Sequence, residues 1–227
     1  MSSTPFPPPA PVLIPILSGE AEHFPVRRIY CVGRNYQAHR KEMGSDDREP
    51  PFFFSKPADA VSLAGADIAF PRATSNLHHE VELVIAIGVG GADIAVSEAL
   101  DHIYGYAVGV DLTRRDLQTY AKERGQPWDS GKAFDQSAPI SAILAWKGKV
   151  PEGRISLSVN GQVRQDASLT DMIWSVPEII AECSRLWRLE PGDLIYTGTP
   201  EGVSRLVQGD RIACEVEAVG KLDFHLV

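Results

Sequence analysis

The segment His78–Ile87, with the sequence HHEVELVIAI, begins with polar and charged side chains and ends as an unbroken apolar run. Side chains two positions apart in a β-strand lie on the same face. Glu80 and Glu82 therefore point to one side of the strand, and that side continues with apolar residues. The other side is apolar throughout, so we predict a strand that is buried on both faces.

The two glutamates of this strand are in electrostatic conflict. Their carboxylates lie about 7 Å apart by strand geometry. In an apolar interior they would repel each other and lose hydration, at a cost of several kcal/mol each unless a proton or a cation intervenes. A divalent metal ion would remove the conflict. The alternative is a solvated strand end with Glu80 and Glu82 in water, and this segment alone does not decide between the two.

A third carboxylate follows the next apolar run. Residues 104–111, YGYAVGVD, form a second predicted strand that ends in Asp111. Three oxygen ligands without a suitable Cys or paired-His pattern favour a hard ion, Mg²⁺ or Mn²⁺. Asp111 could instead cap the helix that follows, and the two roles are compatible. His78 and His79 are adjacent and face opposite sides of a strand, so we predict no zinc site from them.

Short apolar runs alternate with turn signals along the rest of the chain. Asn160-Gly161 separates two of these runs and is typical of a type I′ hairpin turn. Because helices do not regularly separate the strands, we predict a β-rich α+β fold rather than a parallel wound sheet. The predicted strands are 12–17, 28–32, 81–87, 103–110, 155–159, 194–196, 212–216 and 222–227, and the predicted helices are 36–43, 96–103, 112–123 and 168–186, the last interrupted by Pro177.

The composition excludes several classes of protein. The 227 residues include 22 Lys and Arg against 30 Asp and Glu, and the resulting net charge of −8 disfavours nucleic-acid binding. Cys31, Cys183 and Cys214 are far apart and form no C-x-x-C pair, which argues against a disulfide framework and fits a reducing cytoplasm. No apolar run reaches the ~18 residues of a membrane span, so we expect no membrane partner.

Five motifs occur along the chain: Tyr30-Cys31-Val32-Gly33-Arg34-Asn35-Tyr36 with His39 and Glu42, then Asn76–Glu82, Asp111–Gln118, Gly131–Phe134 and Tyr196–Val203. In this order they resemble the fumarylacetoacetate hydrolase family, in its short branch of acylpyruvases and fumarylpyruvate hydrolases. The resemblance begins at about Arg27. We therefore predict an N-terminal arm and leading strand over residues 1–26 and a single catalytic domain over residues 27–227.

The resemblance implies a mixed β-roll of the fumarylacetoacetate hydrolase C-terminal-domain type with a short lid helix, usually in a homodimer. It also implies Mg²⁺ or Mn²⁺ bound by Glu80, Glu82 and Asp111. His39 and Glu42 correspond to a His-Glu pair on the lid. At positions i and i+3 of a helix they would contact each other, which suits a carboxylate-oriented general base. Without the resemblance, this polar segment would be interpreted as a solvated helix face.

Further polar residues match the substrate-binding part of the family. The resemblance implies that Lys132 reaches the substrate beside the metal, whereas a solvent-exposed lysine is the alternative. Arg34, Arg115, Gln118 and Thr199 match the polar rim of the site, although Arg115 could instead pair with Asp116 or Asp111. Lys56 also matches a family segment, and whether it touches the substrate is left open.

These residues together predict metal-dependent hydrolysis of a carbon–carbon bond in a 2,4-dioxo acid, with fumarylpyruvate giving fumarate and pyruvate as the favoured case. The chain has no G-x-S-x-G motif, in agreement with a reaction that needs no nucleophilic serine. The alternatives are oxaloacetate decarboxylase, an isomerase or hydratase of a related dioxo acid, and a non-catalytic metal-binding domain.

Overall fold

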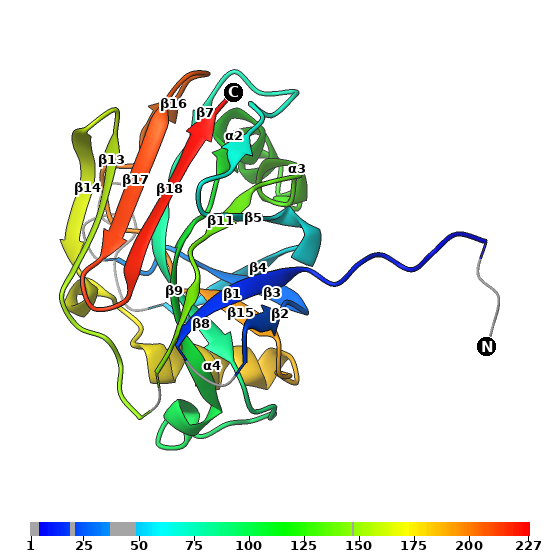
Figure 1. The fold of residues 1–227 in the computed structure, drawn as a ribbon, viewed down its shortest axis with the longest axis vertical. Coiled ribbons are helices and arrows are strands. Elements are labelled where there is room, and N and C mark those ends of the chain that lie inside the picture. The colour runs from blue at the N-terminus through cyan, green and yellow to red at the C-terminus, as the bar shows by residue number, and fades with distance from the viewer. Residues whose placement is uncertain (1–4, 19–20, 37–48, 147) are drawn as a thin grey trace.

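The computed structural model describes residues 5–18, 21–36, 49–146 and 148–227. It consists mainly of β-structure: a ten-stranded mixed sheet, a five-stranded sheet beside it and a small three-stranded sheet. Figure 1 shows helices α2 and α3 at one end of the molecule and α4 at the opposite end. The predicted β-rich α+β class and mixed sheet are confirmed. In this part of the chain, no helix is long and apolar enough to cross a membrane.

The ten-stranded sheet has the order β2-β1-β12-β9-β8-β15-β3-β4, and β5 joins it through β11, which pairs with β9. Its strands are β1 (Leu13–Ser18), β2 (His23–Pro25), β3 (Arg28–Gly33), β4 (Phe52–Lys56), β5 (Val61–Leu63), β8 (Val81–Ile87), β9 (Ile103–Val110), β11 (Ala138–Ile140), β12 (Ile143–Ala145) and β15 (Asp193–Tyr196).

The other two sheets are antiparallel except where β6 joins β18. The five-stranded sheet contains β14 (Gln162–Ser168), β13 (Arg154–Val159), β17 (Arg211–Val216), β18 (Gly220–Leu226) and β6 (Asp67–Ile68), in that order. The small sheet contains β10 (Thr113–Arg114), β7 (Leu77–His78) and β16 (Arg205–Leu206). The helices are α2 (Arg115–Glu123), α3 (Asp129–Lys132) and α4 (Val176–Leu186), with 3₁₀ turns η1 (Ala58–Ala60), η2 (Ala99–His102) and η3 (Leu169–Asp171).

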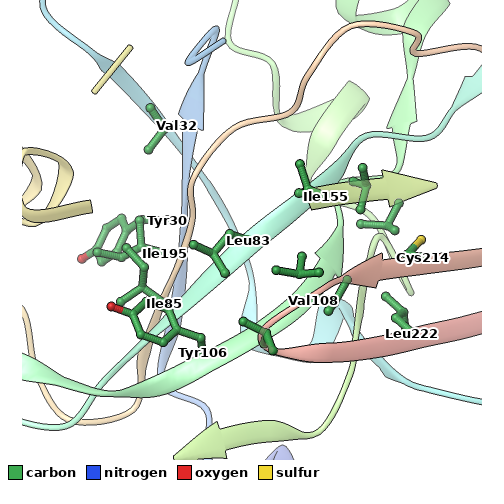
Figure 2. Packing of buried hydrophobic residues seen from close by; sticks show 14 of the residues in the cluster. Tyr30, Val32, Leu83, Ile85, Tyr106, Val108, Ile155, Ile195, Cys214 and Leu222 are labelled. Carbon is green, nitrogen blue, oxygen red and sulfur yellow. The ribbon is translucent and has the colours of Figure 1, made fainter. Parts of the chain in front are cut away.

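Strand β8 lies at the centre of the molecule, and all of its residues are buried, as the sequence predicted. Its alternate side chains enter different hydrophobic clusters. Leu83 and Ile85 pack into the cluster between the two large sheets, part of which Figure 2 shows with Ile155 of β13. Val84 and Ala86 pack into a second cluster on the other face. The face that carries Glu82 therefore continues into this second cluster.

The hairpin prediction at Asn160-Gly161 is confirmed. β13 and β14 pair in antiparallel fashion on either side of it, and both turn residues have positive φ, 52° and 79°, as a type I′ turn requires. Most predicted strands are also found with shifts of one or two residues at their ends. Strand β4 was not predicted, because Phe52–Lys56 lacks a clear alternation and is bordered by prolines.

Three predicted helices are shorter than expected. Only the 3₁₀ turn η2 forms within 96–103, and Ile103 begins β9. Within 112–123, α2 begins at Arg115 because the two preceding residues pair with β7. Within 168–186, Pro177 lies in the first turn of α4, where its missing N–H is not needed, and so it helps to start the helix. The predicted helix 36–43 lies almost entirely outside the described residues.

Candidate active site

Three carboxylates meet where strand β8 begins and strand β9 ends. The strands are antiparallel with Val81 opposite Val110, and the Asp111 N–H donates to the Glu80 carbonyl at 2.8 Å just beyond the ladder. This register brings oxygens of Glu80, Glu82 and Asp111 within 4.8 Å of one another. All three residues are buried, so the solvated strand end is not the arrangement found. We call this group the carboxylate triad.

Lys132, at the end of α3, lies against two members of the carboxylate triad. Its Nζ donates to Glu80 Oε2 at 2.8 Å, to Asp111 Oδ2 at 2.5 Å and to Thr113 Oγ1 at 2.7 Å. Burial disfavours the charge of Lys132, but attraction to Asp111 and Glu80 outweighs this penalty and raises the pKa of the lysine. Lys132 is therefore buried and paired, and the solvent-exposed alternative is excluded.

Arg115 begins helix α2 and also contacts the triad. Its guanidinium forms a short ion pair with Glu80 and donates to Gln118 Oε1 at 2.6 Å. Neither alternative pairing is seen in the described structure: Asp111 pairs with Lys56 and Lys132, and Asp116 accepts from Thr74 Oγ1 at 2.6 Å and from backbone N–H groups. Helix α2 therefore turns Arg115 and Gln118 toward the triad and Asp116 away from it.

Lys56 lies beneath Asp111 and is fully buried. Its Nζ is 2.9 Å from Asp111 Oδ1, and it donates to the carbonyl oxygens of Leu112 and Lys132. Lys56 and Asp111 thus form a buried ion pair, although Oδ1 accepts no hydrogen bond from the described residues. Lys56 therefore compensates the charge of Asp111 from the side opposite to Lys132 Nζ, which lies against Oδ2.

Glu82 is the least compensated member of the triad. Its Oε2 accepts the Gly198 N–H at 2.7 Å, and this close approach depends on the positive φ of Gly198, 98°. Burial, together with repulsion from Asp111 and Glu80, raises the pKa of Glu82 well above its usual value despite this hydrogen bond. A hard divalent cation fits this donor set, because it would be held by oxygen atoms alone and would stabilise the Glu82 carboxylate.

The predicted rim residues line one pocket of about 40 Å³ together with Glu80 and Glu82, two members of the carboxylate triad. The rim residues in its wall are Arg34, Arg115, Gln118 and Thr199, and Lys132 is there as well. Arg34 follows β3 and has a positive φ of 60°. The sequence therefore identified side chains from four separate segments that the fold brings to one place.

A larger aromatic pocket adjoins this one and was not predicted. It has a volume of about 390 Å³ and shares Phe52, Phe54, Trp128 and Lys132 with the smaller pocket. The Phe52 ring packs edge-on against Trp128, with 5.3 Å between centroids. Phe52 also lies so close to Gly33 that a Cβ there would be 2.0 Å from the ring. The run Phe52-Phe53-Phe54 was the available signal for this pocket.

Sequence reasoning also missed Gln165, a buried residue of strand β14. Its side chain forms hydrogen bonds with His79, which precedes Glu80 of the triad, and with Thr199, which lines the pocket. No local signal could have identified it, because its partners are far away in the sequence. His39 and Glu42, the predicted acid–base pair, lie outside the described residues.

The model of the family "Fumarylacetoacetate (FAA) hydrolase C-terminal" matches residues 28–227. The chain belongs to the fumarylacetoacetate hydrolase family. It is therefore an enzyme of that family, and the resemblance found in the sequence is confirmed. The family's β-rich fold agrees with the mixed sheet described above.

Several relatives of this family member are similar over most of their length. The fumarylpyruvate hydrolase of Ralstonia sp is 47% identical over 175 residues, which are 77% of this chain and 91% of the relative. The crystal structure of fumarylpyruvate hydrolase from Pseudomonas aeruginosa in complex with Mn²⁺ and pyruvate superimposes on this chain with a TM-score of 0.95 and 48% sequence identity. The match covers 99% of this chain and 99% of that chain. The mitochondrial oxaloacetate tautomerase FAHD1 of Mus musculus is 41% identical over 203 residues, 88% of this chain and 91% of the relative.

Proposed function

We propose that this protein is a metal-dependent hydrolase that cleaves a carbon–carbon bond of a 2,4-dioxo acid, converting fumarylpyruvate to fumarate and pyruvate. The observation that carries the proposal is the buried carboxylate triad, two members of which line a pocket whose wall includes two arginines. Two similar proteins, at 47% and 48% identity, are named fumarylpyruvate hydrolases. A substrate with a carboxylate next to a carbonyl matches this combination of acidic and cationic groups.

Glu80, Glu82 and Asp111 would hold Mg²⁺ or Mn²⁺. The close approach of three buried carboxylates and the raised pKa of Glu82 support this assignment, because the charge of Glu82 is not fully compensated by protein groups. The Pseudomonas aeruginosa structure contains Mn²⁺. When bound, the metal supplies a Lewis acid that stabilises negative charge developing on a substrate oxygen.

The rim residues bind and orient the substrate in this proposal. Arg34 and Arg115 offer cationic donors to the substrate carboxylate, and Gln118 and Thr199 offer neutral ones. The aromatic pocket next to the triad would receive the acyl group, since Phe52 and Trp128 present flat apolar surfaces to an unsaturated chain. The two adjoining pockets would thus separate the pyruvate part of the substrate from its acyl part.

His39 and Glu42 provide the acid–base chemistry in the proposed reaction. Glu42 orients the imidazole, and His39 takes a proton from the attacking water. The water oxygen adds to the 4-carbonyl carbon, and the bond between that carbon and C3 then breaks. The bonding electrons leave with pyruvate as its enolate, while the acyl part leaves as a carboxylic acid. Lys132 lies at the triad, where it would stabilise or protonate the enolate.

We further propose that residues 27–227 form one catalytic domain and that the protein is a homodimer. The dimer follows from the family resemblance, supported by a strand-rich fold whose sheet edges need cover. Sedimentation at micromolar concentration should give twice the monomer mass of 24.8 kDa, and a monomer would contradict the proposal. All three cysteines are buried and unpaired, which supports a reducing compartment such as the cytoplasm.

A second candidate function is chemistry on oxaloacetate. It is favoured by the Mus musculus relative, which is named an oxaloacetate tautomerase at 41% identity. Decarboxylation of oxaloacetate would release carbon dioxide and form pyruvate enolate, whereas tautomerisation would move a C3 proton through the enolate of oxaloacetate. Neither reaction needs an attacking water, and isomerisation of a related dioxo acid belongs to the same group of reactions. The residues of the triad and rim are suited to each of them.

A side-by-side assay separates these candidates. The purified protein, loaded with Mg²⁺ or Mn²⁺, is given fumarylpyruvate, acetylpyruvate and oxaloacetate under identical conditions. We expect kcat/KM to be highest for fumarylpyruvate, with fumarate and pyruvate as products. A higher kcat/KM for oxaloacetate would overturn the proposal in favour of the second candidate.

A further inference from the structure

Gln165 is fully buried, although it belongs to a strand whose neighbouring residues are mostly exposed. Leu157 pairs with Gln165 and Ser158 with Val163, so Arg164 is an extra residue in β14. Such a bulge redirects the side chains that follow it. Here it places an uncharged polar side chain beneath the pocket wall.

The hydrogen bonds of Gln165 determine the orientation of its carboxamide at both ends. Oε1 accepts the Val81 N–H at 3.1 Å, and a backbone N–H can only donate. Nε2 donates to the Pro200 carbonyl at 2.9 Å, and a carbonyl can only accept. The oxygen and nitrogen positions are therefore set by two partners with fixed roles. His79 Nδ1, 2.8 Å from Oε1, must then carry a proton and donate it.

This orientation also assigns a role to the Thr199 hydroxyl. The remaining hydrogen of Gln165 Nε2 points to Thr199 Oγ1 at 2.8 Å. Thr199 is thus an acceptor toward Gln165 and keeps its own hydroxyl hydrogen for another partner. Within the described residues this hydroxyl donates to no protein group, and Thr199 lines the same pocket as Glu80 and Glu82. The free hydrogen is therefore available to an anionic ligand.

A glycine allows the two segments to come this close. A Cβ at Gly202 would lie 2.1 Å from the Arg164 carbonyl oxygen, and Gly202 has a φ of 90°. The loop that carries Thr199 and Pro200 can therefore lie directly on the bulge of β14. The bulge and the glycine together bring the Gln165 amide within hydrogen-bond distance of Thr199.

We propose that Gln165 is a positioning residue that makes the Thr199 hydroxyl a hydrogen-bond donor to the carboxylate of the bound substrate or product. The proposal rests on the proposed function, because it takes the pocket to be the site for the pyruvate part of the substrate. Gln165 does not touch the ligand and acts only through Thr199. It connects the five-stranded sheet to a pocket that is otherwise built by the ten-stranded sheet and helices α2 and α3.

The test is a double-mutant cycle with pyruvate as the probe and Mn²⁺-loaded protein in the calorimeter. Thr199→Val keeps the shape of the side chain and removes the hydroxyl. We expect it to raise the Kd for pyruvate by about 10- to 100-fold, the effect of one hydrogen bond to a charged group. Gln165→Met should raise the Kd by about tenfold or more. The double variant should bind within about twofold of Thr199→Val, because Gln165 acts through a group that is already gone.

Controls distinguish this role from a general structural one. The Kd for Mn²⁺ without pyruvate should stay near the wild-type value in every variant. Ser204→Ala removes the hydrogen bond at the other side of His79, where Nε2 lies 2.8 Å from Ser204 Oγ, and leaves the Gln165 amide fixed. This matched variant should bind pyruvate within about twofold of the wild type. If Gln165→Met does not fold, Gln165→Glu at alkaline pH replaces it, since the introduced carboxylate cannot donate to Thr199 and should weaken pyruvate binding similarly.

Each outcome has a distinct meaning. Wild-type protein that binds Mn²⁺ but not pyruvate would overturn the proposed function and this inference with it. Wild-type protein that binds pyruvate, with Gln165→Met binding it equally well, would overturn the inference alone. Independent, multiplying effects of the two substitutions would also overturn it, because Gln165 would then not act through Thr199.

Discussion

Two buried acidic regions lie at opposite ends of neighbouring strands, and they are built differently. Asp193 begins β15 and accepts bonds from Arg28 Nε at 3.2 Å and Nη2 at 2.9 Å, from Arg27 and from the Glu190 N–H at 2.9 Å. Glu82, in the adjacent strand β8, accepts one backbone N–H and is pressed against two other carboxylates. Both side chains are almost completely buried.

The difference between them separates a structural carboxylate from a functional one. Asp193 is surrounded by donors on several sides, so its charge stabilises the fold around it. Glu82 lacks such donors, so its charge is compensated fully only when a cation binds. Burial alone would have placed these two residues in the same class, and the number of donors is what distinguishes them.

Among the substitutions that test this difference, Glu82→Gln should have the largest effect on metal binding and activity. We expect metal affinity to fall by roughly 10²-fold or more and hydrolysis to fall to background, because one of the three carboxylates proposed to bind the metal is lost. The free energy of unfolding of the metal-free protein should be unchanged or higher, since an uncompensated charge is removed. Metal titration and thermal unfolding of the same preparation check this. Unchanged metal binding would remove Glu82 from the site.

The next effect concerns the predicted acid–base pair. His39→Ala should lower hydrolysis of fumarylpyruvate by roughly 10² to 10⁴, the usual contribution of a positioned general base. Any turnover of oxaloacetate, which needs no attacking water, should fall less. Glu42→Gln should give a milder form of the same defect. Both rates are measured at saturating Mg²⁺ with folded protein, and hydrolysis that survives His39→Ala would show that His39 is not the base.

Asp193→Asn should have the opposite profile to Glu82→Gln. Two arginines would lose their buried partner, and breaking such a pair costs about 3–5 kcal/mol of unfolding free energy. Arg27 and Arg28 are partly exposed and can regain water, so we expect the lower part of this range. Metal affinity should be retained at temperatures where the variant is folded. Denaturant unfolding measures the loss, and a loss of metal binding in the folded variant would contradict the comparison.

The smallest effect is a pH dependence of the metal-free protein. The pKa of Glu82 is raised in the folded state, so folding favours its protonated form. The associated stability is therefore present below the unfolded pKa of about 4.3 and is lost as pH rises through the raised folded value. Thermal unfolding in EDTA should show this decline, and Glu82→Gln should reduce it. A metal-free protein whose Glu82-dependent stability increases over this range would contradict the assignment.

The parts of this architecture that could be predicted are those with a local signal. Strand β8 could be identified because Val81–Ile87 is apolar at every position except Glu82. A short apolar run of this kind is typical of a strand that is buried on both faces. The hairpin at Asn160 follows from the backbone preferences of two residues. The metal site could be predicted in the same way, because the ends of the strands and the alternation of side chains limit where Glu80, Glu82 and Asp111 point.

What could not be predicted depends on contacts between distant segments. Lys56 compensates Asp111, which is 55 positions later, and nothing in the local sequence around Lys56 indicates a buried ammonium group. Gln165 follows a polar hairpin that resembles an exposed edge, and only the bulge at Arg164 turns its side chain inward. Strand β4 depends on pairing with β3 rather than on its own pattern. In each case the deciding interaction is absent until the chain has folded.

The pairing of β8 with β9 limits where insertions and deletions can be accepted during evolution. Val81 lies opposite Val110, and removal of Val81 would turn every later side chain of β8 to the other face. Leu83 would then lie where Glu82 is, and the carboxylate would face the hydrophobic layer between the sheets. Residues 88–102, which connect the two strands, carry no such constraint. Changes in length among homologous chains should therefore accumulate in that connection, while both strands keep their number of residues.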